Sequence, residues 1–327
     1  MPTFTCSKSA TALVNLEFPR LVASAFYRIA YKFHHKFCLR PQPQLRIPVV
    51  IVGSYLAGGA GKTPFTIWLA KYFQEQGKKI AILCHNAAWD EFLLLKRELH
   101  LESTRNSHTT SQRSTLQIPH EIKIIATANR YATAKKIQDK FDIVICDDGF
   151  EDTRFTGAIR FCLDWQEPPT SWTRLLPSGP FRSLKQDHNE NGIIHLDCFN
   201  ANTPDIHFFI ESITNFTPGN PLTAEIICGL GAPKRFIEDV HAFGNRFGIA
   251  IQNSITRPDH DRHFSQIIES ELSKDKDIII SQKDACRLPQ AILTHPKLHV
   301  TIQKMTITNR TMGIIHRVTN KQTTQPH

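Results

Sequence analysis

The sequence predicts an α/β fold built on a mostly parallel sheet that is flanked by helices. A β-branched run at 47–53, a helical pattern at 62–76 and a second run at 79–84 form a strand–helix–strand unit. The same alternation of strand-like and helical segments continues from residue 122 to residue 197. Such alternation is typical of a parallel sheet covered by helices.

A second α/β group follows in the C-terminal part of the chain. Strand and helix patterns alternate again over 205–307, and the segment 214–223 is rich in turn-forming residues. We therefore expect a larger domain at 41–215 and a smaller α/β domain at 216–327. The polar, Ser/Thr-rich segment 102–120 is expected to form a surface loop.

The composition is that of an ordinary globular protein, because 41% of the 327 residues are hydrophobic and 21% are charged. Eight cysteines are scattered without a C-x-x-C pair, which suits a reducing cytosol better than a disulfide framework. The net charge of +9 favours an anionic partner, and charge alone leaves open nucleic acid, an acidic membrane surface or a phosphorylated ligand. No uninterrupted apolar run reaches about 18 residues, so a transmembrane helix is not expected.

Residues 1–40 carry the pattern of a basic amphipathic helix. Apolar side chains recur at helical spacing at Phe18, Val22, Ala25, Phe26, Ile29, Phe33 and Phe37. Lysines and arginines lie largely off that stripe. Such a helix suits the interface of a membrane with anionic lipids. It also suits packing against its own domain, and both interpretations remain open.

The segment LAGGAGKT, residues 56–63, has the pattern of a phosphate-binding loop. It follows a predicted strand and opens a predicted helix, so backbone N–H groups and the positive end of the helix dipole would face an anion. We expect nucleotide phosphates to bind along the whole loop, at Leu56, Ala57, Gly58, Gly59, Ala60, Gly61, Lys62 and Thr63. Lys62 would reach the β- and γ-phosphates, and Thr63 would offer its hydroxyl to Mg²⁺.

Two acidic residues, Asp147 and Asp148, end the predicted strand 141–148. A phosphate-binding loop is usually accompanied by an acidic residue at the end of a neighbouring strand, where it completes the metal site. An Asp pair followed by glycine is also a common turn. With the loop upstream, we favour Mg²⁺ binding by Thr63, Asp147 and Asp148.

Six segments, taken in their order, resemble one family. They are IPVVIVGSYLAGGAGKTPFTIWLAKYF, DIVICDDGFEDTRF, RLLPSGPFRSL, GLGAPKRF, RPDHDRHF and SQKDACRL. This series is similar to the tetraacyldisaccharide 4'-kinases of lipid A synthesis, and the resemblance covers nearly the whole chain. No single motif is decisive, but the combination is specific.

The resemblance implies transfer of the γ-phosphoryl group of ATP, with Mg²⁺, to the 4'-hydroxyl of an acylated glucosamine disaccharide lipid. It implies a peripheral protein at the cytoplasmic face of the bacterial inner membrane, with residues 1–40 associating with that membrane. Residues 41–215 would be the kinase domain, and 216–327 would close over the active site. We expect the lipid and the membrane surface as partners, with no stable protein partner. We expect no nucleic acid either, because the chain has no aromatic RNA-binding string or zinc cluster.

The resemblance also implies roles for individual residues. Asp90 would be the base that accepts the hydroxyl proton, His260 would assist it within an Asp259–His260 element, and Lys62 would act on the phosphates. Arg130 and Arg182 align with family arginines and would pair with phosphate.

The chain departs from the family pattern at three places. CHNA at 84–87 replaces the family's Arg-Gly-Tyr-Gly segment, which is expected to touch substrate, and the stretch from there to Asp90 is shorter than in the family. Glu151 and Asp152 replace an amide and an imidazole, which adds negative charge near the phosphates unless Mg²⁺ or Arg154 compensates it. An alternative therefore stays open: a nucleotide-binding protein that kept the fold, lost the kinase reaction and acts as a binding or regulatory module.

Overall fold

The structure, a computed structural model, describes residues 8–105, 121–200, 202–259 and 261–323. The expected loop at 102–120 begins later than the sequence suggests, because helix α3 continues to Arg105. The rest of that expected loop lies outside the described residues.

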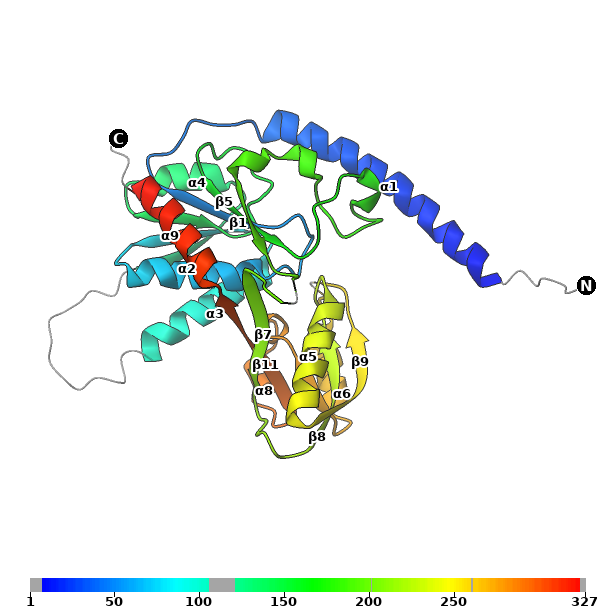
Figure 1. The fold of residues 1–327 in the computed structure, drawn as a ribbon. Coiled ribbons are helices and arrows are strands. Elements are labelled where there is room, and N and C mark those ends of the chain that lie inside the picture. The colour runs from blue at the N-terminus through cyan, green and yellow to red at the C-terminus, as the bar shows by residue number, and fades with distance from the viewer. Residues whose placement is uncertain (1–7, 106–120, 201, 260, 324–327) are drawn as a thin grey trace, which may run out of the picture.

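A six-stranded parallel sheet forms the first part of the fold (Figure 1). Its strands are β1 (Val49–Gly53), β2 (Ile80–His85), β3 (Ile122–Thr127), β4 (Ile143–Cys146), β5 (Ile159–Asp164) and β6 (Ile193–Asp197). They lie in the order β3-β2-β4-β1-β5-β6, and every neighbouring pair is parallel. The expected parallel sheet is thus confirmed.

Helices cover both faces of this sheet. They are α2 (Lys62–Glu75), α3 (Trp89–Arg105) and α4 (Arg130–Ile137), and short 3₁₀ turns occur at Trp172–Arg174, Lys185–Asp187 and Glu190–Gly192. Successive side chains of a strand point to opposite faces of the sheet, so alternate residues of β1 belong to two different hydrophobic cores, one on each face. Val50 packs with Phe65 of α2, whereas Ile51 packs with Tyr131 of α4.

A second sheet of five strands belongs to the C-terminal part. The strands are β7 (Ile206–Ile213), β8 (Leu222–Cys228), β9 (Ile249–Thr256), β10 (Asp277–Ile280) and β11 (Leu298–Ile307). Their order is β7-β11-β10-β8-β9, with β7 antiparallel to β11 and the other pairs parallel. The helices of this part are α5 (Pro233–Phe247), α6 (Phe264–Leu272), α7 (Gln282–Ala285), α8 (Gln290–Leu293) and α9 (Asn309–Thr323).

The sheets divide the chain earlier than the sequence-based boundary at residue 215. Strand β7 belongs to the second sheet, so the change of sheet falls between Asp197 and Ile206. Helix α9 returns to the first part, where Ile315 is buried in the core beneath α2. Sequence patterns did not show this return, because α9 reaches its partner only through the tertiary fold.

Helix α1 (Lys8–Cys38) is a long helix that projects beyond the first sheet (Figure 1). Part of it is anchored: the Ser24 hydroxyl donates to the carbonyl of Leu175 at 3.0 Å, and the Tyr27 hydroxyl donates to the carbonyl of Arg182 at 2.8 Å. Its apolar stripe remains open, since Phe18 and Phe26 are each 69% exposed. Within the described ranges, no helix is long and apolar enough to cross a membrane.

Candidate active site

The phosphate loop follows the carboxyl end of β1, which is an interior strand of the six-stranded sheet. Gly58, Gly59 and Gly61 have φ of 95°, 64° and 76°, a region that glycine adopts without the strain of a Cβ. Gly61 precedes the first turn of α2, which contains Lys62 and Thr63, both largely buried. The sequence therefore folds here into a loop that ends at a helix N-terminus, as anion binding requires.

The first two amides of the loop are already engaged within the protein. The Leu56 N–H donates to the Ser54 hydroxyl at 3.2 Å, and the Ala57 N–H donates to the carbonyl of Pro180 at 2.9 Å. The N–H groups of Leu56 and Ala57 thus hold the loop itself in place, and their expected contacts with phosphate stay a prediction.

Asp147 lies beside the first turn of α2, because β4 is the direct neighbour of β1. The hydroxyls of Thr63 and Thr66 donate to its two carboxylate oxygens, at 3.1 Å and 2.7 Å. Burial raises the pKa of Asp147, although the threonine hydrogen bonds act in the opposite direction. The structure thus brings together a hydroxyl and a carboxylate oxygen, the kind of hard ligands that Mg²⁺ takes.

Asp148 is held by two cations. The Lys62 ammonium lies 3.1 Å from its Oδ1, and Nη1 of Arg182 donates to both carboxylate oxygens at 2.9 Å and 2.8 Å. Burial alone would raise the pKa of Asp148, but Lys62 and Arg182 outweigh it and hold the pKa below its usual range. Asp148 is therefore a partly buried anion beside the phosphate loop.

Arg130 lies at the start of a helix after the strand 122–127, as expected. It is buried at the start of α4, and its Nη2 donates to the backbone carbonyls of Asp147 and Asp148 at 2.8 Å and 3.1 Å. It fixes the turn that carries the two aspartates. Its pairing with a phosphate stays a prediction, as does that of Arg182.

Asp90 lies in the first turn of α3, where it is almost completely buried. Its Oδ1 accepts the Glu91 N–H at 3.1 Å, and its Oδ2 lies 3.1 Å from the ammonium of Lys283. The same ammonium lies 3.4 Å from Oδ1 of Asp259. Lys283 therefore brings two of the expected catalytic residues together. The third, His260, lies outside the described residues.

Sequence reasoning did not predict the contact of Lys283 with Asp90, Glu91 and Asp259. Glu91 follows Asp90 directly, and its Oε1 lies 3.7 Å from the Lys283 ammonium. Burial, together with the charge of Asp147, raises the pKa of Glu91 to about 7. The available signal for Lys283 was its position in SQKDACRL, directly after the buried strand β10.

The C-terminal part contacts the phosphate loop directly. A Cβ added to Gly59 would lie 2.4 Å from the Cβ of Ala232, so the two backbones approach closely. The Trp165 indole N–H donates to the carbonyl of Ala60 at 2.9 Å, and the guanidinium of Arg235 lies 3.8 Å from the centroid of a Trp165 ring. The loop is thus enclosed by groups from both parts of the chain.

The comparisons with known proteins identify the family. The sequence model of the family described as tetraacyldisaccharide-1-P 4'-kinase (LpxK) matches residues 18–321. The chain belongs to this kinase family.

Relatives and a solved structure support the family assignment. The chain is 26% identical to a tetraacyldisaccharide 4'-kinase from Herminiimonas arsenicoxydans, over 85% of this chain and 83% of that protein. It is 24% identical to one from Chlamydia caviae, over 82% and 80%. The fold is similar to that of LpxK from Aquifex aeolicus, described as in complex with ATP, with a TM-score of 0.56, 17% identity and coverage of 94% and 98%.

The two extra carboxylates that separate this chain from the family pattern are both engaged by neighbouring side chains. Arg154 pairs with Asp152, with Nη2 2.7 Å from Oδ2. Glu151 accepts hydrogen bonds from Ser183, at 2.8 Å, and from Tyr31 of α1. Asp152 is therefore paired with a cation, whereas Glu151 is held by two hydroxyl groups, one of which comes from the N-terminal helix.

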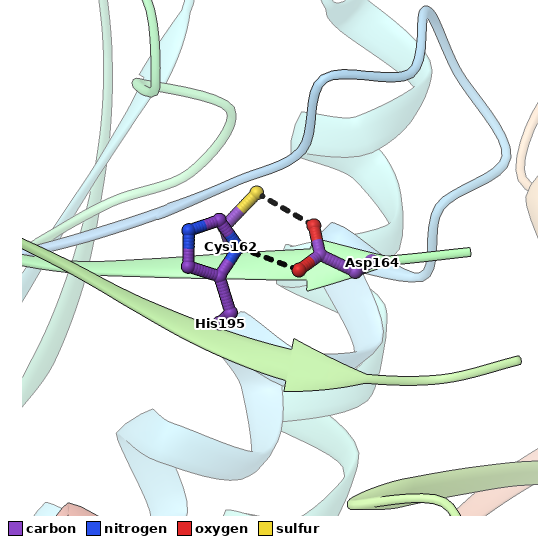
Figure 2. A group of neighbouring side chains, drawn as sticks. All are labelled: Cys162, Asp164 and His195. Atoms are coloured by element: carbon purple, nitrogen blue, oxygen red, sulfur yellow. Dashed lines mark hydrogen bonds and ion pairs between the residues drawn. The ribbon is translucent and has the colours of Figure 1, made fainter. Parts of the chain in front are cut away.

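A second polar cluster lies on β5 and β6 and consists of Cys162, Asp164 and His195 (Figure 2). The Cys162 thiol donates to Asp164 at 3.2 Å, and Nδ1 of His195 lies 2.6 Å from the same carboxylate. The other ring nitrogen of His195 lies 3.2 Å from Glu190. The hydrogen bond to Asp164 raises the pKa of His195. Both ring nitrogens of His195 thus face carboxylates, and the contacts of the cluster join β5 to β6.

Proposed function

We propose that this protein transfers the γ-phosphoryl group of ATP to the 4'-hydroxyl of a tetraacyldisaccharide 1-phosphate. The observation that carries the proposal is the convergence of the phosphate loop with Asp147, Asp148 and Arg182 in a chain of this family. Phosphoryl transfer requires positioning and neutralisation of charge more than covalent chemistry, and these residues supply both.

On the nucleotide side, Lys62 would bind the β- and γ-phosphates. It is the first residue of α2, so its ammonium and the helix N-terminus act on the same anion. The Thr63 hydroxyl and the Asp147 carboxylate lie 3.1 Å apart and fit a Mg²⁺ ion, with Asp148 beside them. When bound, the ion would neutralise charge on the phosphates.

On the acceptor side, Asp90 is the candidate base. It is buried and held at both oxygens, which fixes its orientation for accepting a proton from a hydroxyl group. Asp259 lies close by through their shared lysine, and its neighbour in the sequence, His260, would assist the proton transfer. In the alternative interpretation, Asp90 is only an acidic residue that stabilises the first turn of its helix. Measurements of activity distinguish the two roles.

The lipid acceptor would reach the site along helix α1. Phe18, Phe26 and Trp172 line an apolar groove of about 320 Å³ on this helix, together with Leu21, Val22, Ala25 and Ile29. Basic side chains on the same helix would attract anionic lipids. This pattern supports a peripheral position on the cytoplasmic face of the bacterial inner membrane, where the lipid substrate is present.

The C-terminal part would close over the active site. Its loop at 229–232 lies against the phosphate loop, and Lys283 brings its α7 to Asp90 of α3. A lid of this kind excludes water from the reacting phosphate, which would otherwise be hydrolysed.

The test is to incubate the full-length protein with ATP, Mg²⁺ and a tetraacyldisaccharide 1-phosphate, and to analyse the lipid by mass spectrometry. The proposal predicts a lipid that carries two phosphates. ATP binding without such a product would reject the kinase and favour a binding or regulatory module that has lost the reaction. CHNA at 84–87 is the segment that motivates this second candidate, because it replaces the family's usual substrate-contacting segment.

A further inference from the structure

Lys283 has an unusual environment for a lysine. Its ammonium lies 3.1 Å from Asp90, 3.4 Å from Asp259 and 3.7 Å from Glu91, and its side chain is only 19% exposed. A largely buried ammonium is stable only where anions compensate its desolvation. Each of the three carboxyl groups lies within 4 Å of this one cation.

The three carboxylates come from two separate parts of the fold. Asp90 and Glu91 begin α3, which packs on the first sheet, whereas Asp259 follows β9 of the second sheet. Lys283 itself lies on α7, directly after β10. One side chain therefore connects the acceptor side of the site with the C-terminal part of the chain.

The element that carries Lys283 is firmly held. The Ser281 hydroxyl accepts the backbone N–H of Asp284 at 3.0 Å, and the fully buried Asp284 carboxylate accepts the Gly229 N–H at 3.2 Å. Gln282 donates to Glu98 of α3 at 3.1 Å. The position of the Lys283 ammonium is thus set by the second sheet and transmitted to the first turn of α3.

We propose that Lys283 is a positioning residue of the kinase reaction, which ties the Asp90 carboxylate to Asp259 across the two parts of the chain. The role rests on the proposed function, because it concerns the base of that reaction. Lys283 differs from Lys62, whose ammonium faces Asp148 on the phosphate side. Lys62 thus belongs to the nucleotide side of the site, and Lys283 belongs to the acceptor side.

The first test compares Lys283→Met with Lys283→Arg. Methionine keeps much of the side-chain volume without the charge, so we expect kcat to fall about 30-fold or more while KM for ATP changes less than threefold. Arginine restores the charge. On a logarithmic scale of kcat, Lys283→Arg should therefore recover at least a third of the loss seen in Lys283→Met. The control is Lys304→Met, which breaks an ion pair with Glu211 inside the second sheet and should leave kcat unchanged.

Three outcomes would overturn the proposal. One is a Lys283→Met variant with kcat within twofold of the unchanged protein. Another is a lost activity that arginine does not restore, together with a lowered unfolding temperature in both variants, which would indicate a structural role only. A third is a rise in KM for ATP without a fall in kcat.

A second readout needs no turnover and separates this inference from the proposed function. If the unchanged protein forms no lipid product, the proposed function fails, and amide hydrogen exchange in the first turn of α3 then decides about Lys283. Lys283→Met should exchange at least fivefold faster there than the unchanged protein and Lys304→Met. Equal exchange in all three proteins would show that Lys283 does not position Asp90.

Discussion

The ammonium of Lys62 lies 3.1 Å from Oδ1 of Asp148, which joins the phosphate loop to the strand that ends beside it. The contact pairs the buried Lys62 ammonium with the partly buried Asp148 carboxylate when no phosphate is present. Arg182 binds the same carboxylate, so Asp148 would retain a cation if Lys62 turned to a phosphate. The nucleotide side is therefore organised before ATP arrives.

Glu91 should make the stability of the metal-free protein fall as pH rises. Its folded pKa of about 7 exceeds its ordinary value of 4.5, so the folded protein retains a proton that the unfolded chain has released between these values. Stability contributed by the protonated form is therefore lost as pH rises through that window, on the order of 2 kcal/mol. Urea unfolding of Glu91→Gln should lack this decline, whereas the exposed Glu269→Gln should retain it. Parallel pH curves for all three proteins would contradict this.

Gly59→Ala should weaken ATP binding. The new Cβ would lie 2.4 Å from the Cβ of Ala232, and alanine is strained at φ of 64°. We expect KM for ATP to rise about tenfold or more, measured by initial rates. Gly313→Ala is the control: a Cβ at this position on α9 meets nothing within 4 Å, so activity should persist and stability should rise by about 0.5–1 kcal/mol. Equal KM values in the two variants would count against the close packing at Gly59.

Arg235→Gln should raise KM for ATP about three- to tenfold, with a smaller effect on kcat. The guanidinium packs on Trp165, and Trp165 holds the carbonyl of Ala60 in the phosphate loop. Loss of the cation–π contact would loosen that hydrogen bond. Arg246→Gln removes a similar contact with Phe247 on the same helix, away from the loop, and should leave KM unchanged. A rise in KM in both variants would indicate a general effect on α5.

Replacing Phe26 and Phe33 with serine should reduce binding to anionic lipid vesicles about tenfold or more, as measured by cosedimentation. Both side chains are exposed on α1, at 69% and 64%. Phe199→Ser removes another exposed phenylalanine, 53% exposed and outside α1, and should not alter vesicle binding. If vesicle binding survives the double change, the result favours the alternative in which α1 serves only to pack against its own domain.

The features that the sequence predicted are those that short segments encode. The strand, loop and helix around Lys62 follow from apolar runs and glycines, and Asp147 directly follows β4, which ends at Cys146. Their meeting follows from topology, since neighbouring parallel strands end at the same edge of a sheet.

The features that escaped prediction depend on contacts between distant segments. The role of Lys283 arises only when α7 packs on α3, which brings residues far apart in the sequence together. The same reason explains α9, whose buried Ile315 packs on the first sheet's core after the chain has built the second sheet. The position of Arg130 on the carbonyls of the aspartate turn also required the folded backbone.

The most direct test of the central claim is transfer of ³²P from [γ-³²P]ATP to a tetraacyldisaccharide 1-phosphate, compared between the unchanged protein and Lys62→Ala. We predict a labelled lipid with two phosphates from the unchanged protein. Lys62→Ala should lower the rate about 100-fold or more, because it removes the cation that binds the transferring phosphate. An unlabelled lipid despite bound ATP, or equal rates in the two proteins, would contradict the account.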